Sequence, residues 1–210
     1  MLVLREDQIV PLLTMPDAVR AVERALRAQA DGTARMPLRV GVPAHAGILA
    51  AMPGSLITDG SALGAKLVTV FEGNVECRLP THQGAVILFN PQTGTPEALL
   101  DARYVTEVRT AAVSAVATRL LAIAQAHVAA ILGTGVLARS HALAMREAMA
   151  LEELRIWGRS LERAEEMAAW AREQGLPARA VGEVTAAIHG AHVINTVTAS
   201  KVPILDAADV

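Results

Sequence analysis

The sequence predicts an α/β protein in two parts: an N-terminal α+β part with an antiparallel sheet, and a C-terminal part with a parallel sheet. Three observations predict this fold class. Residues 39–101 contain short apolar runs separated by Gly, Pro and Asn, which is typical of closely connected antiparallel strands. Residues 127–196 alternate strand and helix patterns, as βαβ units do. A glycine-rich turn joins the first strand and helix of that second part.

The N-terminal part begins with one amphipathic helix. Thr14 is its expected N-cap, Asp17 occupies the capping-box position, and Gly32 is expected to end it. Four strands are expected after this helix, at residues 48–51, 65–71, 85–89 and 96–101. Residues 90–94 are expected to form the turn between the last two strands, because Pro and Gly occupy positions where turns favour them.

An alanine-rich helix over 104–121 is expected to connect the two parts. Four strands are expected after it, at residues 127–132, 154–157, 178–181 and 192–196. The helices between them are expected at residues 138–149, 161–173 and 184–189. These patterns place the domains at 1–122, which includes the connecting helix, and at 123–210.

The composition excludes several classes of protein and site. A net charge of −2 and an aromatic content of 2% provide neither a basic nor a stacking surface for nucleic acid. Cys77 is the only cysteine, so we expect no disulfide framework and no cysteine-based metal cluster. The histidines form no H-E-x-x-H pattern, so we expect no metal site. The N-terminus lacks signal-peptide features and no apolar stretch is long enough to span a membrane, so we expect a cytoplasmic protein.

The glycine-rich turn has the pattern G-x-G-x-x-A, formed by Gly133, Gly135 and Ala138. Gly133 is expected to make the tight turn, Gly135 to let the backbone approach a pyrophosphate, and Ala138 to keep the helix close to the strand. Thr134 and Val136 complete the loop, whose amides and helix dipole would bind phosphate. An ordinary strand-to-helix loop is the alternative. The position of the motif inside a βαβ unit favours a Rossmann-type domain that binds a nicotinamide cofactor.

The residues after the second strand of this domain distinguish NAD from NADP. An acidic side chain there would bond the ribose 2′-hydroxyl, whereas Arg would bind a 2′-phosphate. The sequence has Arg159 and Ser160, with no carboxylate before Glu162, and therefore predicts NADP(H) rather than NAD(H). The alternative is that Arg159 is a solvated loop residue. Thr198, just after the fourth strand, is expected to contact the nicotinamide half of the cofactor.

Three basic residues, Arg39, Lys66 and Arg109, stand in otherwise apolar surroundings. Seventeen of the nineteen basic residues are Arg, so a lysine inside an expected core strand is unusual. Lysine differs from arginine in having a pKa that burial and cationic neighbours can lower to suit proton transfer, while two arginines suit bidentate binding of a carboxylate. The alternative is that Lys66 faces solvent and Arg109 forms a surface ion pair with Glu107.

Three runs of the sequence resemble the ornithine cyclodeaminase/mu-crystallin family. They are GAKLVTVFEGN (64–74), LPTHQGAVILFNPQTGTPEALLDARYVTEVRTAAVSAVATRLLA (79–122) and ILGTGVLARSHALA (131–144). Their order and spacing extend the similarity from about residue 36 to the C-terminus. The resemblance implies a substrate-binding and dimerisation domain, a Rossmann domain after it, and a homodimer. The family includes ornithine cyclodeaminases, alanine dehydrogenases, ketimine reductases and an NADPH-binding crystallin.

The resemblance also implies roles for individual residues. Lys66 would be the catalytic lysine beside the nicotinamide, and Arg39 and Arg109 would hold the substrate carboxylate. Three further residues would line the substrate or cofactor pocket: Thr81, Gln83 and Thr110.

The sequence departs from the family in two ways. Cyclodeaminases have a Glu before the Met-Pro pair that here is Met52-Pro53, and this sequence has Ala51. The family's chains are also longer, and only four strands follow residue 126 where a doubly wound sheet has about six. We therefore expect that the sequence lacks the C-terminal third of the family's chain, including its catalytic Asp.

These observations predict an NADP(H)-dependent oxidoreductase that acts on a small amino or imino acid. One alternative is an ornithine cyclodeaminase, a lyase in which bound NAD takes and returns a hydride within one cycle. The other is a crystallin-like protein that binds NADPH and a carboxylate ligand without turnover. The absence of Glu at position 51 disfavours the cyclodeaminase.

Overall fold

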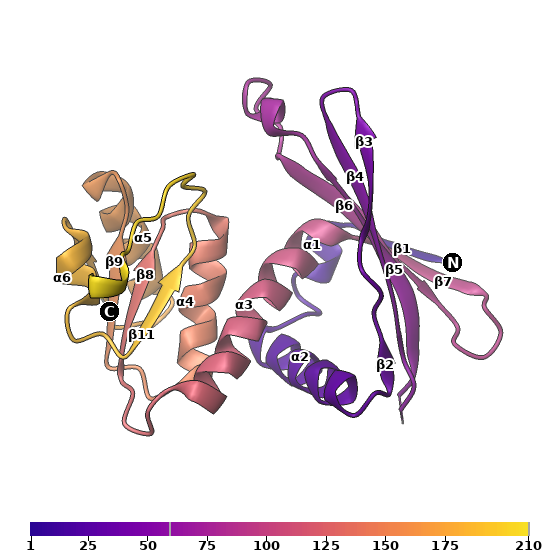
Figure 1. The fold of residues 1–210 in the computed structure, drawn as a ribbon, viewed down its shortest axis with the longest axis horizontal. Helices are drawn as coiled ribbons and strands as arrows, with labels where there is room; N and C mark the ends of the chain where they lie inside the picture. Colours follow the sequence, from indigo (N-terminus) through magenta and orange to yellow (C-terminus); the bar gives the residue numbers. More distant parts are fainter. Residues whose placement is uncertain (59, 210) are drawn as a thin grey trace. The chain divides into compact units, whose positions relative to one another are not determined.

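The computed structural model describes residues 1–58 and 60–209 (Figure 1). The chain forms two compact units. The first unit comprises Met1–Thr14 and Arg20–Thr106, and the second comprises Met15–Val19 and Glu107–Val210. The division falls within the long helix α3 (Ala102–Leu121), most of which belongs to the second unit. The domain boundary expected at residue 122 stays a prediction.

The first unit is built on a seven-stranded sheet. Its strands are β1 (Leu2–Leu4), β2 (Ala34–Arg35), β3 (Val40–Ala44), β4 (Gly47–Leu56), β5 (Ala62–Val70), β6 (His82–Phe89) and β7 (Pro96–Asp101). Their order is β1-β7-β6-β5-β4-β2, and β3 also pairs with β4. All pairs are antiparallel except β1 with β7. The four expected strands are therefore present, and the predicted α+β unit with an antiparallel sheet is confirmed.

The predicted turn between β6 and β7 is present. The Oδ1 atom of Asn90 accepts hydrogen bonds from the backbone N–H groups of Gln92 and Thr93, both at 3.0 Å. Gly94 follows at a φ of +71°, a conformation that glycine adopts without steric cost. Local side-chain and backbone preferences thus fix the register of this hairpin.

Strand β4 is longer than expected and passes through Pro53. Proline has no N–H group for a ladder hydrogen bond, so it is tolerated only where one side of the strand is unpaired. β3 pairs with β4 at residues 47–51 and β2 at residues 55–56. Pro53 therefore lies in the gap between these two partners, while the other side of β4 pairs with β5 throughout.

Strands β1, β2 and β3 were not expected from the sequence. β1 has only three residues, and its partner β7 lies more than ninety residues further along the chain. β3 contains Gly41 and Pro43, and all five of its residues are exposed. Long-range pairing therefore forms β1, whereas β3 is formed by a tight hairpin with β4 that starts at the Ala44–Gly47 pair.

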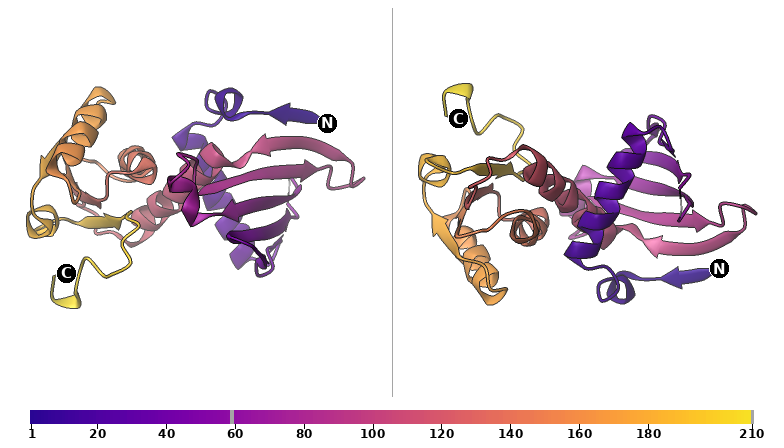
Figure 2. Two further views of the ribbon diagram at one scale, coloured as in Figure 1. Left: turned by 90° about the horizontal axis from the view of Figure 1, so that it is seen from above. Right: turned by 90° about the horizontal axis from the view of Figure 1, so that it is seen from below.

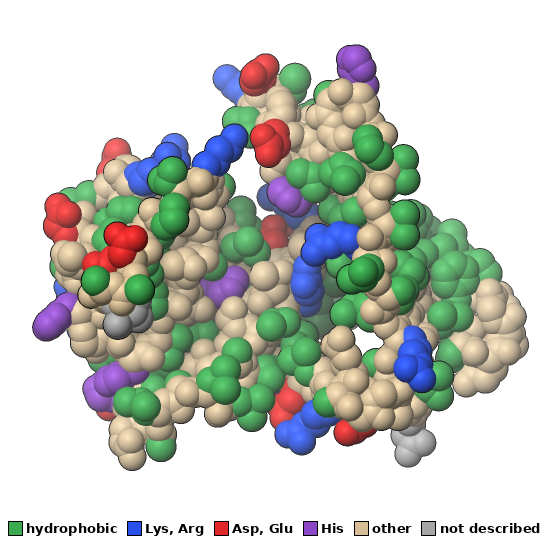
Figure 3. All heavy atoms as spheres, viewed as in Figure 1, with side chains coloured by type: hydrophobic (Ala, Val, Ile, Leu, Met, Phe, Trp, Pro, Cys, Tyr) green, Lys and Arg blue, Asp and Glu red, His purple; other side chains and the backbone are tan. Residues whose placement is uncertain are grey.

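Apolar side chains are partly exposed on both faces of this sheet. One face carries Val40, Val42, Leu49 and Leu67, whose exposed fractions are between 40% and 61%. Figure 3 shows hydrophobic side chains at the surface over the region of β3 and β4. The opposite face carries Ala50, which is buried. Ile48 and Leu88 also lie on that second face and are 38% and 36% exposed, so it is only partly covered.

Two helices accompany the sheet. α1 (Glu6–Ile9) contacts β7, and α2 (Met15–Ala30) begins directly after Thr14, as predicted. Gly32, at a φ of +74°, ends α2, and the N–H of Thr33 bonds the carbonyl of Ala28 at 2.8 Å. The part of α2 within this unit runs along one face of the sheet (Figure 2).

The second unit has a parallel sheet with the strand order β10-β9-β8-β11. Its elements after α3 are β8 (Val128–Leu132), α4 (Val136–Ala148), β9 (Glu153–Trp157), α5 (Leu161–Glu173), β10 (Ala178–Val181), α6 (Val184–Ile188) and β11 (Val193–Thr196). Each lies within two residues of its expected position, and the order is that of the first half of a Rossmann fold. The predicted parallel-sheet domain is confirmed.

Helices cover both faces of this sheet. Ala130 and Leu132 of β8 pack with Ala187 and Ile188 of α6. The alternate residues of β8 are also buried, as a strand covered on both faces requires. No helix of residues 1–58 and 60–209 has both the length and the apolar character to cross a lipid bilayer.

Candidate cofactor and substrate site

Gly133 is required because another backbone segment passes very close to it. Its φ is +147°, and a Cβ atom there would lie 2.3 Å from the carbonyl oxygen of Val197, after β11. Its N–H donates a 2.8 Å hydrogen bond to the carbonyl of Trp157, at the end of β9. The expected tight turn is thus a junction of three strand ends, which the sequence pattern did not specify.

Gly135 has open space around it. It is the N-cap of α4 in an extended conformation, and nothing lies within 4 Å of the position of a Cβ atom. No side chain caps the helix, and Val136 and Leu137 in its first turn are exposed. The first amides of α4 therefore have no side-chain cap, and uncapped amides at a helix N-terminus can bind a phosphate group. Ala138 is fully buried, which keeps α4 close to the sheet.

The residues after β9 open helix α5. Ser160 is the N-cap, and its Oγ accepts a 3.3 Å hydrogen bond from the N–H of Arg163. Arg159 is exposed, and Gly158 before it is buried. No carboxylate stands at the end of β9, as the sequence indicated. The capping role of Ser160 is an addition to the expected role in cofactor binding.

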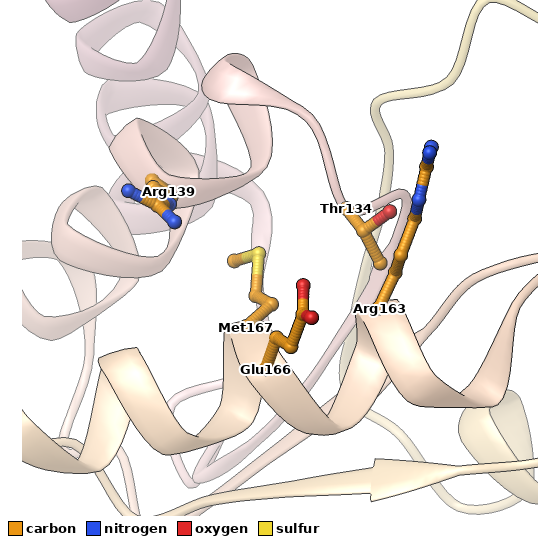
Figure 4. Close-up of a pocket in the computed structure, with 5 residues that line it drawn as sticks. All are labelled: Thr134, Arg139, Arg163, Glu166 and Met167. Atoms are coloured by element: carbon orange, nitrogen blue, oxygen red, sulfur yellow. The ribbon is translucent and has the colours of Figure 1, made fainter.

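A cavity of about 210 Å³ lies beside the glycine loop (Figure 4). It is lined by Thr134 of the loop, Arg139 of α4, and Arg163, Glu166 and Met167 of α5. The guanidinium of Arg139 lies 5.1 Å from the ring centroid of Trp170. Of these residues, only Thr134 was predicted from the sequence. Among the others, the sequence points only to Arg139 and Arg163, as basic residues in the first turns of two helices. Basic residues at such positions are also common on solvated surfaces.

Thr198 belongs to the segment that follows β11. The N–H of Val197 bonds the carbonyl of Leu132 at 3.0 Å, so this segment continues the sheet beside the glycine loop. The Oγ1 of Thr198 accepts a 3.2 Å hydrogen bond from the N–H of Ser200. The expected contact of Thr198 with the cofactor stays a prediction.

The base of α4 is tied to α3 by a buried histidine. The Nδ1 of His141 lies 2.7 Å from the carbonyl oxygen of Leu137, and its Nε2 lies 3.1 Å from the Oγ of Ser114. Burial lowers the pKa of His141, so the neutral ring is favoured. The contact holds the second turn of α4 against α3 within the second unit.

Lys66 lies on the same face of the first unit's sheet as Ala50 and is itself half-buried. It pairs with Met52 of β4, and Ala51 before Met52 pairs with Val40 of β3. Arg39 precedes Val40, so its backbone lies about two strand spacings, or roughly 10 Å, from that of Lys66. Two long basic side chains can converge over that distance. Arg39 itself is exposed.

Gln83 does not share this face. It pairs with Thr69 of β5, three residues from Lys66, and side chains alternate between faces along a strand. The register therefore places Gln83 on the opposite face of the sheet from Lys66, together with Leu67. Thr81, just before β6, is half-buried, and its Oγ1 lies 3.0 Å from Nδ1 of His82. The pocket-lining roles of Thr81 and Gln83 stay predictions.

Arg109 and Thr110 are consecutive residues of α3 in the part that belongs to the second unit. They point about 100° apart around the helix axis, as the helical repeat requires. Arg109 is exposed and Thr110 is half-buried.

Comparison with known proteins identifies relatives over most of the chain. Residues 1–210 match the model of the ornithine cyclodeaminase/mu-crystallin family. Ketimine reductase mu-crystallin of Mus musculus is 41% identical over 177 residues, which cover 83% of this chain and 55% of that protein.

Solved structures of the same kinds of protein are also similar to this chain. An archaeal alanine dehydrogenase dimer with bound NAD has a TM-score of 0.93 and 31% identity, covering 100% of this chain and 64% of the other. The Delta(1)-pyrroline-2-carboxylate reductase of Thermococcus litoralis, in complex with NADH and L-proline, has a TM-score of 0.86 and 30% identity, covering 93% and 61%. This chain therefore spans less than two thirds of the length of these relatives. It belongs to the ornithine cyclodeaminase/mu-crystallin family.

Proposed function

We propose that the protein is an NADP(H)-dependent oxidoreductase of a small amino or imino acid. The observation that carries the proposal is the N-terminus of α4, which begins at Gly135 without a side-chain cap. Guanidinium groups line the cavity beside it, and no carboxylate stands at the end of β9. The names of the relatives, a ketimine reductase, an alanine dehydrogenase and a pyrroline-carboxylate reductase, agree with this class of reaction.

The cofactor is bound by the glycine loop and the start of α5. The amides of Val136 and Leu137 hold the diphosphate. Arg159 and Ser160 bind the 2′-phosphate; the Ser160 hydroxyl can donate to it, because its Oγ only accepts from Arg163 N–H. Two relatives have NAD or NADH bound, so the preference for NADP(H) rests on this chain's own residues.

The substrate is held by the basic residues. Arg39 and Arg109 bind its carboxylate, Thr110 lines the substrate or cofactor pocket, and Thr198 contacts the nicotinamide half of the cofactor. A nicotinamide, when bound, supplies or accepts the hydride at the substrate α-carbon. Lys66 gives a proton to the substrate nitrogen during reduction and takes one during oxidation, which balances the charge of the hydride.

We also propose a homodimer formed through the exposed apolar face of the first unit's sheet. That face carries Val42, Leu49 and Leu67, and an apolar surface of this kind is typical of interfaces. Gln83 lies on the same face, so it would approach the partner subunit. Light scattering should give twice the chain mass, and Leu67→Glu should shift the protein toward monomer.

A substrate panel tests the proposed reaction. The full-length protein is incubated with 2-oxo acids plus ammonia or methylamine, with cyclic ketimines, and with ornithine, while NADPH absorbance and proline are followed together. NADPH consumption with an imino or oxo acid supports the proposal. Proline from ornithine without net change of NADPH overturns it in favour of a cyclodeaminase, and tight ligand binding without any turnover overturns it in favour of a binding protein.

A further inference from the structure

Gly158, at the end of β9, has no room for a side chain. A Cβ atom there would lie 2.6 Å from the Cγ2 methyl of Thr134 in the glycine loop, and 3.6 Å from the carbonyl oxygen of Ser160. The threonine side chain is short and β-branched, so it has few ways to move aside. This is the strand end where NAD-dependent Rossmann domains place the acidic residue that binds the ribose. In this chain, Thr134 occupies the space that such a side chain needs.

The same Thr134 lines the cavity into which Arg163 projects. Figure 4 shows Arg163 extending alongside Thr134, with the Glu166 carboxylate on the cavity side of α5. The backbone of Arg163 is fixed because its N–H bonds the Oγ of Ser160. Among residues 1–58 and 60–209, no ion pair joins the guanidinium of Arg163 to a carboxylate. Arg139, on the other side, is engaged with the ring of Trp170.

The charges here favour an anion close to Ser160. Arg159 and Arg163 flank this N-cap, and the positive end of the α5 dipole lies at the same point. Glu166, one turn further along α5, opposes an anion in the cavity.

We propose that Thr134 and Gly158 form a matched pair that excludes a ribose-binding carboxylate, and that Arg163 is a second ligand of the cofactor's 2′-phosphate beside Arg159. The inference rests on the proposed function, since it concerns the same cofactor site. Glu166 weakens binding of the 2′-phosphate and so limits the preference.

Binding of adenosine 2′,5′-bisphosphate and of 5′-AMP, measured by calorimetry, tests the role of Arg163. Arg163→Gln should weaken binding of the bisphosphate about tenfold, as expected for loss of one charge-assisted hydrogen bond. It should change the affinity for 5′-AMP less than about twofold. Glu166→Gln should strengthen binding of the bisphosphate, because it removes a negative charge from the cavity. Arg24→Gln, at an exposed position of α2, removes the same charge as a control. Equal effects of Arg163→Gln on both nucleotides, or effects equal to those of Arg24→Gln, would overturn the assignment.

Binding of NADH to two variants tests the matched pair. Gly158→Asp alone should not gain NADH affinity, because the aspartate meets Thr134. Gly158→Asp with Thr134→Ala should gain it, with circular dichroism verifying that both variants fold. Equal NADH binding by the single and double variants would overturn the pairing. If the unmodified protein binds neither NADPH nor NADH, the proposed function itself fails. If it binds both and only these variants depart from the expected affinities, this inference alone fails.

Discussion

The Oγ hydroxyl of Ser114 on α3 donates a hydrogen bond to Nε2 of His141 on α4, across 3.1 Å. The direction follows from the other ring nitrogen, because Nδ1 lies 2.7 Å from the carbonyl oxygen of Leu137, which can only accept. Burial lowers the pKa of His141, so the folded state favours the neutral imidazole with the proton on Nδ1.

This histidine should make the fold sensitive to mild acid. The unfolded chain binds the proton more readily than the folded one, so stability is complete above the ordinary histidine pKa of about 6.5 and falls as the pH drops toward the lowered value. The slope from one group is at most about 1.4 kcal/mol per pH unit. Chemical unfolding between pH 7.5 and 5 should show this slope in the unmodified protein and lose it in His141→Gln. His45→Gln, at an exposed position, should retain it; an unchanged slope in His141→Gln would contradict the assignment.

A second pH effect is expected in a different window. Arg155 and Arg179 hydrogen-bond the Glu153 carboxylate at 2.9 and 2.6 Å and lower its pKa to about 2. The carboxylate is the form that stabilises the fold, so its contribution is present above about pH 4.5 and is lost as the pH falls toward 2. Because the side chains are partly exposed, we expect about 1–2 kcal/mol rather than the full value of the shift. Glu153→Gln should lower stability at pH 7 and flatten its fall below pH 4.5, whereas Glu165→Gln, at an exposed position in the middle of α5, should change both much less.

The sequence predicted elements whose local pattern and tertiary environment agree. All five residues of β8 are apolar and buried on both faces, so a continuous apolar run identified the strand correctly. β3 was missed because an exposed edge strand with Gly41 and Pro43 has no such pattern. Its pairing with β4 is nevertheless what places Arg39 near the level of Lys66.

Only the backbone of the glycine loop in the candidate site was predictable from the sequence. The glycine spacing correctly located the opening of α4, because a backbone approach requires residues without side chains. The contact of Gly133 with Val197 joins segments 64 residues apart, and no local pattern encodes it. Arg163 and Glu166 have the spacing of ordinary surface charges on a helix, so only the structure shows that they line a cavity.

Replacement of Lys66 should separate binding from chemistry. Lys66→Ala should bind NADPH normally but lose at least about a hundredfold in kcat, the usual contribution of a positioned proton donor. Lys201→Ala removes the only other lysine, which is exposed, and should keep normal turnover. Fluorescence titration with NADPH and steady-state kinetics on the same preparations provide both values. Normal turnover by Lys66→Ala would remove this lysine from the mechanism.

Two glycine variants should distinguish a folding role from a binding role within one loop. Gly133→Ala places a methyl group 2.3 Å from the carbonyl oxygen of Val197 at a φ of +147°, so we expect a loss of about 2 kcal/mol or more in stability. Gly135→Ala meets nothing within 4 Å and has an ordinary φ of −84°, so its melting temperature should stay close to that of the unmodified protein. Its methyl group would nevertheless project where the diphosphate approaches α4, and NADPH affinity should fall about tenfold or more, as loss of one charge-assisted hydrogen bond implies. Calorimetric unfolding and NADPH titration on both variants make the comparison. A Gly135→Ala protein that binds NADPH with unchanged affinity would show that the cofactor does not lie against this helix.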